Sequence, residues 1–388
     1  MPASGTAGSA SSSGGNRSGS PYISTTFRFA WLARAIGTRL SWFKGGQATP
    51  PKPPFHLPAA HHSCAIRGSI SSLPAAGSHL GRKCPARGYT GAFASARNLP
   101  MIKGSIVELV TPADSNGAIK FESLEALVDW HVVEGSAALL VGDTLDAALD
   151  LDAEERLELW RRVVWQAEGR IAVIAGLSAD QLETSLEFAR AADEAGVDAV
   201  LLTLPATPFP SKDKLLRYVE AVAKAVKQPL LLRSRAERIA PSTVDALARI
   251  EGVSGFVDGA SDITRARELL ALHLPVGFAL YAGNDLAAMP FVLEGFAGGV
   301  STTANLVPRM VRKLHDAALS GDRAEAEALQ KPLQSLLQAQ PEDNLPRAVQ
   351  WALIEMGRVA ESTPPLALSQ AKDYASLRRA LRSAGCAI

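Results

Sequence analysis

The sequence predicts an α/β protein, a (β/α)8 TIM barrel with a C-terminal three-helix subdomain, preceded by a disordered N-terminal extension. Beyond residue 104, eight short apolar runs alternate with amphipathic helical stretches. The runs are nearly continuous in apolar residues, as strands are when both faces of a parallel sheet are covered. Eight such units in roughly 210 residues suit a closed barrel better than an open sheet. No glycine-rich dinucleotide-binding fingerprint follows any run, which argues against a doubly wound sheet.

The first hundred residues have a different composition, rich in Ser, Gly, Pro and Arg, with eight Arg, three Lys and no acidic residue. Such a segment buries too little apolar surface to offset its chain entropy. Its composition resembles an organellar transit peptide. The interpretation that we favour is an over-extended reading frame, because Met101 opens a sequence like the start of a complete bacterial enzyme. We therefore expect an extension over 1–100, a barrel over 101–321 and a helical subdomain over 322–388.

The remaining residues hold 29 basic and 39 acidic side chains, a net charge of −10. This balance is typical of an acidic soluble protein and argues against nucleic-acid binding. No uncharged apolar run reaches about 18 residues, so no membrane span is predicted. Cys64, Cys84 and Cys386 have neither metal-ligand spacing nor a disulfide framework. We expect no cofactor and no metal, and a cytoplasmic protein, or an organellar one if the extension is a transit peptide.

The strands and helices are predicted from the spacing of apolar residues and from the residues that begin or end each element. The expected strands are residues 105–111, 137–142, 171–175, 199–204, 229–232, 253–257, 276–281 and 299–303. Helical patterns include residues 153–167, 181–195, 212–226 and 242–250. Pro241 and Pro308 suit first-turn positions, and Asp262 and Asp285 suit N-caps. The glycines expected to follow helices are Gly135, Gly169, Gly196 and Gly252.

The site of such a barrel lies at the C-terminal ends of its strands. Four aspartates fall near those ends: Asp143, Asp146, Asp258 and Asp285. They could together hold Mg²⁺ or Mn²⁺ and polarise a 2-oxo acid. The favoured alternative is structural: Asp285 caps a helix, Asp258 pairs with Arg233 or Arg235, and the others are solvated. The two arginines could instead bind a carboxylate or phosphate, or compensate the aspartates. His131, His273 and His315 lie on helices or loops away from this face.

Several motifs resemble those of the dihydrodipicolinate synthase and N-acetylneuraminate lyase family of pyruvate-dependent lyases. They are Gly104-Ser105-Ile106-Val107, Val173-Ile174-Ala175-Gly176, Gly283-Asn284-Asp285, the run from Gly299 to Asn305, and the run from Pro346 to Leu353. The resemblance covers the whole of 101–388. It implies substrate-binding positions at Gly142, Arg233, Arg238, Gly283 and Val300, and a catalytic position at Thr144.

The sequence departs from the family where the chemistry lies. The resemblance implies a lysine at the end of strand 6, whose amine forms an imine with pyruvate, and the matching residue is Val257. It implies a proton-relay tyrosine on strand 5, and the matching residue is Arg233. A tyrosine lent by the neighbouring subunit is replaced by Ala206 or Thr207.

The family's nominal reaction is condensation of pyruvate with aspartate semialdehyde in lysine biosynthesis. Without the lysine and the tyrosine, we expect a non-catalytic binder of a 2-oxo acid or carboxylate, or a partner subunit. Members of the family are commonly homotetramers, so we expect a homo-oligomer or a mixed oligomer with an active paralogue. The alternative is a metal-dependent lyase acting on a 2-oxo acid.

Overall fold

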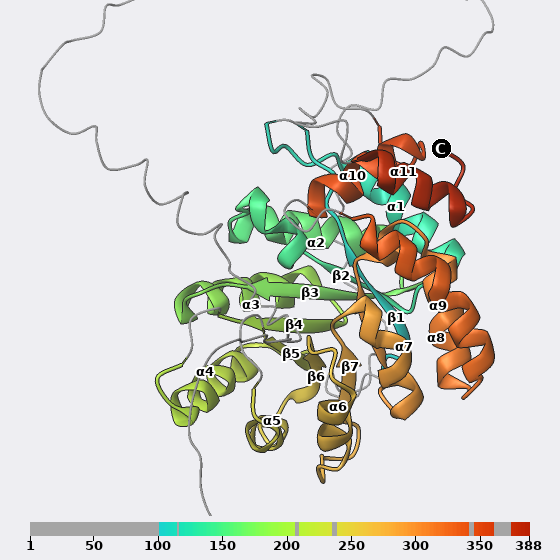
Figure 1. The fold of residues 1–388 in the computed structure, drawn as a ribbon. Coiled ribbons are helices and arrows are strands. Elements are labelled where there is room, and N and C mark those ends of the chain that lie inside the picture. The colour runs from blue at the N-terminus through green and yellow to red at the C-terminus, as the bar shows by residue number, and fades with distance from the viewer. Residues whose placement is uncertain (1–100, 115, 206–208, 235–238, 341–344, 361–373) are drawn as a thin grey trace, which may run out of the picture. The chain divides into compact units, whose positions relative to one another are not determined.

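A computed structural model describes residues 101–388, apart from 115, 206–208, 235–238, 341–344 and 361–373. Eight parallel strands close into a barrel in the order β1-β2-β3-β4-β5-β6-β7-β8, so the predicted fold class is confirmed. The helices surround the barrel and the last of them gather at one side (Figure 1). The strands are Gly104–Leu109, Ala138–Val141, Ala172–Ser178, Ala199–Leu204, Leu230–Ser234, Val253–Asp258, Ala279–Ala282 and Gly298–Ser301.

Eleven α-helices and two 3-10 helices connect and follow the strands in the described part of the chain. Helices α1 to α8 are Phe121–Glu134, Ala153–Ala167, Leu182–Ala195, Lys212–Ala225, Pro241–Ala248, Ile263–Leu270, Asp285–Glu294 and Pro308–Leu319. The 3-10 helices η1 and η2 are Thr144–Leu149 and Thr303–Asn305. The C-terminal helices α9 to α11 are Arg323–Gln338, Leu345–Glu355 and Tyr374–Ser383.

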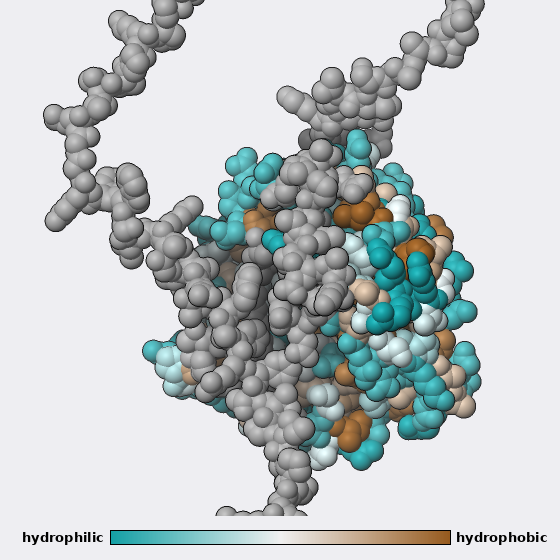
Figure 2. All heavy atoms as spheres, turned by 45° about the horizontal axis from the view of Figure 1, so that its top comes forward, coloured by the Kyte–Doolittle hydropathy of each residue, from teal (hydrophilic) through white to brown (hydrophobic). Residues whose placement is uncertain are grey.

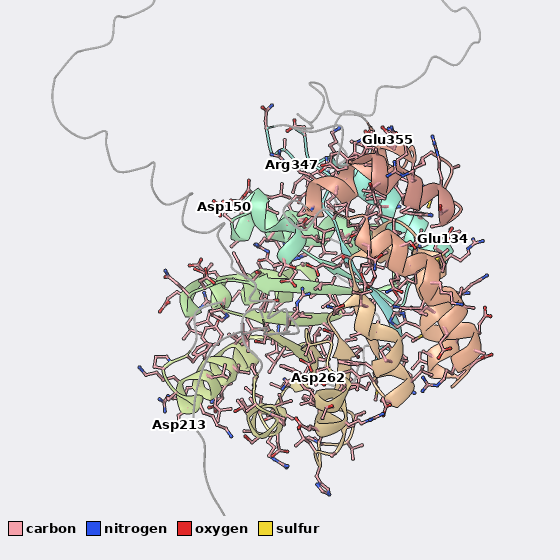
Figure 3. All side chains as sticks on the ribbon, viewed as in Figure 1. Glu134, Asp150, Asp213, Asp262, Arg347 and Glu355 are labelled. Atoms are coloured by element: carbon pink, nitrogen blue, oxygen red, sulfur yellow. The ribbon has the colours of Figure 1, made fainter. Side chains whose placement is uncertain are left out.

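Most predicted helix boundaries are confirmed. Pro241 and Pro308 open α5 and α8, and the Asp262 side chain caps α6 by accepting from the Thr264 N–H at 2.9 Å (Figure 3). The prediction for α7 was wrong by one residue, because Asn284 accepts from the Leu286 N–H and is the N-cap.

Several strand boundaries also differ from the prediction. Strand β7 begins three residues later than predicted, since Gly277 takes a positive φ of 87° that an extended strand does not use. Strand β5 runs to Ser234, so Arg233 lies inside the strand.

Two apolar layers hold the barrel. One fills its interior and includes Ile106, Leu140, Leu201 and Val257, and the other lies between the strands and the surrounding helices. On the face in Figure 2, hydrophilic side chains predominate and hydrophobic ones appear in separate spots. Among the described residues, no helix is long and apolar enough to cross a membrane.

Candidate functional site

Polar side chains meet where the strands end inside the barrel. Glu108 lies near the end of β1, Asp143 follows β2, Thr203 lies on β4 and Arg233 on β5. Thr203 and Arg233 are register partners on adjacent strands. Strands β1 and β5 are four positions apart in a closed barrel of eight, so a contact between them must cross the interior.

Arg233 makes that crossing contact. Its Nη1 donates to Glu108 Oε2 at 2.9 Å, and its Nη2 donates to Asp143 Oδ2. Thr203 Oγ1 donates to Asp143 Oδ1 at 2.9 Å. The side chains of Arg233, Glu108 and Asp143 are only 11%, 3% and 0% exposed. The guanidinium therefore bridges two buried carboxylates, and we call Glu108, Asp143 and Arg233 the ion cluster.

The remaining oxygen of Glu108 fixes the start of η1. Glu108 Oε1 accepts from the Leu145 N–H at 3.0 Å and from the Thr144 hydroxyl. Thr144, the predicted catalytic residue, is thus tied to the ion cluster. Glu108 itself was missed from the sequence. A charged residue inside the apolar run of 105–110 was the available signal, because such a residue is rarely buried without a partner.

Just as Glu108 of β1 binds the start of η1, Asp146 of η1 binds the residues that follow β1 and β2. Its carboxylate accepts from the Thr111 N–H at 2.9 Å, the Thr111 hydroxyl at 2.6 Å and the Gly142 N–H at 3.2 Å. Burial raises the pKa of Asp146 to about 6, and the nearby Glu108 charge adds to the rise, while the hydrogen bonds act against it. Gly142, a predicted substrate-binding residue, has a φ of 76°, which glycine tolerates best.

The four aspartates near the strand ends have separate partners. Asp258 pairs with Arg265 of α6 at 2.9 Å, which corrects the expectation that it would pair with Arg233; Arg235 lies outside the described residues. Asp285 accepts from the Thr303 N–H at 3.1 Å instead of capping α7. Within the described ranges, no group of three or more His, Cys, Asp or Glu residues is arranged to hold a metal ion.

Val257 lies in the interior apolar layer and is fully buried. It is the register partner of Arg233 on one side and of Tyr281 on the other. Gly283 lies against it, since a Cβ added there would come within 3.0 Å of Val257 Cγ1. The predicted residue Val300 belongs to the same interior layer. Arg238 lies outside the described residues.

Comparison with known proteins identifies the family. Residues 101–384 match the model of the dihydrodipicolinate synthetase family. The chain is 38% identical over 290 residues to the 4-hydroxy-tetrahydrodipicolinate synthase of Methylococcus capsulatus, covering 74% of this chain and 99% of that protein. It is 36% identical over 290 residues to the 4-hydroxy-tetrahydrodipicolinate synthase of Pseudomonas aeruginosa. This match also covers 74% of this chain and 99% of that protein.

Solved structures agree with the sequence relatives. The Acinetobacter baumannii dihydrodipicolinate synthase, determined in complex with pyruvate, is 31% identical with a TM-score of 0.68. The match covers 74% of this chain and all of that one. The Aquifex aeolicus enzyme is 28% identical, also with a TM-score of 0.68, over 73% of this chain and 98% of that one. The chain belongs to the dihydrodipicolinate synthetase family.

Proposed function

We propose that this chain is a non-catalytic member of its family, unable to form an imine with pyruvate. The observation that carries the proposal is the identity of two neighbouring residues, Arg233 near the end of β5 and Val257 near the end of β6. Val257, at the position where the family resemblance implies the reactive lysine, is a buried apolar side chain. Arg233, at the position of the implied relay tyrosine, is bound into the ion cluster.

Imine formation needs a neutral amine that can reach a carbonyl carbon in the barrel. Topology places Lys120 and Lys212 toward the C-terminal side of the barrel. Their ammonium groups donate to the carbonyls of Ala360 and Ser242, each at 2.9 Å. Both hydrogen bonds lie at exposed positions and not in the barrel interior, which supports the proposal that neither lysine replaces the missing amine.

The charge of the ion cluster favours one of the two expected non-catalytic roles. Two carboxylates face a single guanidinium, so Arg233 already has the bidentate anionic partners that a ligand carboxylate would otherwise supply. The excess negative charge repels a 2-oxo acid in this low-dielectric interior. We therefore favour a partner subunit that assembles with an active relative over a 2-oxo-acid binder.

Imine trapping tests the first part of the proposal. The full chain is incubated with pyruvate, reduced with borohydride and measured by intact mass spectrometry, beside an active synthase as the positive control. We expect an adduct on the synthase and none on this chain. A mass shift of one reduced pyruvate on the folded chain would contradict the proposal.

Co-assembly tests the second part. The full chain and an active synthase from the same cells are co-expressed, and affinity-captured material is measured by native mass spectrometry. We expect oligomers that contain both chains. Homo-oligomers alone, with both proteins folded and present in excess, would contradict the partner-subunit role and leave the absence of imine chemistry unaffected.

A further inference from the structure

The loop between β1 and α1 carries Asn116 followed by Gly117, the one Asn-Gly dipeptide in the 388 residues. The stem of this loop is held by the rest of the protein. Ala113 forms an isolated β-bridge with Ile119, and its carbonyl accepts from the side chain of Gln350 in α10 at 2.6 Å. The tip is not covered, because Asn116 and Gly117 are both exposed. A change at the tip can therefore occur while the protein stays folded.

The hydrogen bonds at the tip involve the main chain of Asn116 and not its amide group. Asp114 Oδ1 accepts from the Asn116 N–H at 2.8 Å and from the Ala118 N–H at 3.0 Å. The Gly117 N–H donates to the Asp114 carbonyl at 3.1 Å. Within the described part of the chain, the Asn116 side chain makes no hydrogen bond of its own, so its carboxamide is free to turn toward the main chain.

The surroundings of Gly117 leave its backbone nitrogen accessible. Its φ is 88°, and a Cβ placed on it would meet no atom within 4 Å. Because glycine has no Cβ, nothing hinders the approach of this nitrogen to the preceding side chain. The hydrogen bond that Gly117 donates lies in an exposed loop with few packing contacts, and such bonds open at a small cost in free energy.

We propose that Asn116 is a site of spontaneous covalent modification, through a cyclic imide formed with Gly117. The Gly117 amide nitrogen loses its proton to water and bonds to Asn116 Cγ. The bond from Cγ to Nδ2 breaks, and ammonia leaves. Water then opens the ring at either of its two carbonyls, which gives aspartate or isoaspartate at this position. The sequence of steps needs only water and involves no oxidation or reduction.

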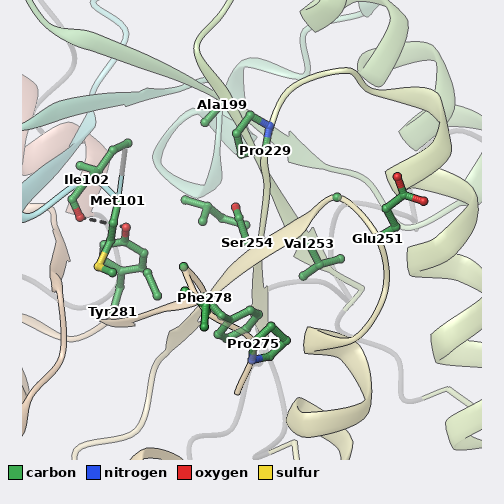
Figure 4. Close-up of a pocket in the computed structure, with 15 residues that line it drawn as sticks. Met101, Ile102, Ala199, Pro229, Glu251, Val253, Ser254, Pro275, Phe278 and Tyr281 are labelled. Carbon is green, nitrogen blue, oxygen red and sulfur yellow. Dashed lines mark hydrogen bonds between the residues drawn. The ribbon is translucent and has the colours of Figure 1, made fainter. Parts of the chain in front are cut away.

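Both products alter the tip of the loop. Each places a new carboxylate close to that of Asp114, and like charges at this distance repel. In the isoaspartate product the main chain also passes through the former side chain, which shifts the N–H groups that Asp114 accepts from. The loop follows β1 at the end of the barrel that carries the ion cluster. The cavity of about 350 Å³ in Figure 4 opens at the opposite end, at the N-terminal ends of β4 to β7, and is not affected.

Two other asparagines of the described chain serve as controls within the same molecule. Asn284 caps α7 by accepting from the Leu286 N–H at 2.9 Å. Asn305 is fully buried, and its Nδ2 donates to the Glu108 carbonyl at 2.7 Å. Neither is followed by glycine. Both amide groups are held by the fold, so modification at either residue first requires local unfolding.

The test is peptide mapping of the folded full chain by mass spectrometry after incubation in a mildly alkaline buffer. Replacement of the amide by a carboxylate adds about 1 Da, and chromatography separates the isoaspartate peptide from the aspartate peptide. We expect modification at Asn116 to be at least about tenfold faster than at Asn284 or Asn305, since only those two must first be released by local unfolding. We also expect isoaspartate among the products, because the imide opens at either carbonyl.

A variant and a peptide make the test decisive. Asn116→Gln keeps the amide but needs a larger, slowly formed ring, so we expect no modification there. A synthetic peptide of residues 114–118 gives the rate of the same dipeptide outside the fold. Rapid modification of the peptide with none in the folded chain would overturn the proposal, because the loop would then protect the site. Equal rates at Asn116 and Asn305, or a product that contains aspartate alone, would also overturn it.

Discussion

Arg233 on β5 and Glu108 on β1 form a 2.9 Å ion pair across the inside of the barrel, although 125 residues separate them in the sequence. The two strands lie on opposite sides of the closed sheet, so the arginine side chain spans the end of the barrel where this fold places its chemistry. The Arg233 guanidinium occupies this part of the barrel interior.

Breaking the ion cluster is expected to destabilise the protein strongly. Arg233→Met leaves the Glu108 and Asp143 carboxylates buried without their cation, and removing one partner of a buried pair costs about 3–5 kcal/mol. Glu194→Gln is the matched control, because Glu194 pairs with Arg161 at 2.6 Å on the surface, where such pairs contribute about 0–1 kcal/mol. Urea unfolding of both variants measures the difference. Equal losses of stability would show that the cluster does not hold the barrel.

A lysine placed at position 257 is not expected by itself to give efficient imine formation. In Val257→Lys the new ammonium lies beside Arg233 and within the field of the two carboxylates, which favour its charged, non-nucleophilic form. Adding Glu108→Ala leaves only the Asp143 carboxylate beside the Arg233 guanidinium. The charged form of the new lysine is then favoured less, and more of the neutral amine is available. Borohydride trapping with pyruvate at pH 7 should therefore give more adduct with the double variant than with Val257→Lys. An equal, complete adduct from the single variant would contradict this account of the cluster.

The sequence predicted what depends on local pattern and on the order of elements. The apolar runs and first-turn prolines predicted the strands and helix starts, and strand β4 was predicted to the residue. Val257 was placed correctly at the end of β6, because the run from 253 ends in a charged residue. Asp285 was mistaken for the α7 cap because Asn284 before it is an equally good cap residue, and only geometry distinguishes the two.

The ion cluster could not be predicted in the same way. Arg233 was correctly suspected of compensating carboxylates, but one of its two partners is on β1 and the other follows β2. Strand order in a barrel of eight places β1 opposite β5, but sequence spacing does not show which side chains meet across the interior. Asp258 was expected to pair with Arg233 or Arg235 on the same grounds. Its partner is Arg265, which lies three residues after the Asp262 N-cap of α6.

Asp146 is expected to make the stability depend on pH in a defined direction. Its folded-state pKa of about 6 lies above the ordinary value of 3.8, so the folded protein binds the proton more tightly than the unfolded chain. The unfolding free energy contributed by this group therefore rises as pH falls from above 6 to about 4, by about 3 kcal/mol. The measurement is the difference in unfolding free energy between the unmodified chain and Asp146→Asn from pH 7.5 to 4. A difference that stays constant with pH would refute the assignment.

His131 is expected to act in the opposite direction. The ring is fully buried in α1, with Nδ1 3.1 Å from the Ser136 hydroxyl, and burial lowers its pKa from 6.5 to about 3. Because the folded state resists protonation, stability is lost as pH falls below 6.5 and the loss grows until about pH 3. Relative to His131→Gln, which keeps a polar group near Ser136, the unmodified chain should lose about 3 kcal/mol between pH 7.5 and 4. His273, on the loop after α6, provides the control, since His273→Gln removes an exposed histidine instead of a buried one. If both substitutions change the pH profile equally, burial of His131 is not what makes the fold sensitive to acid.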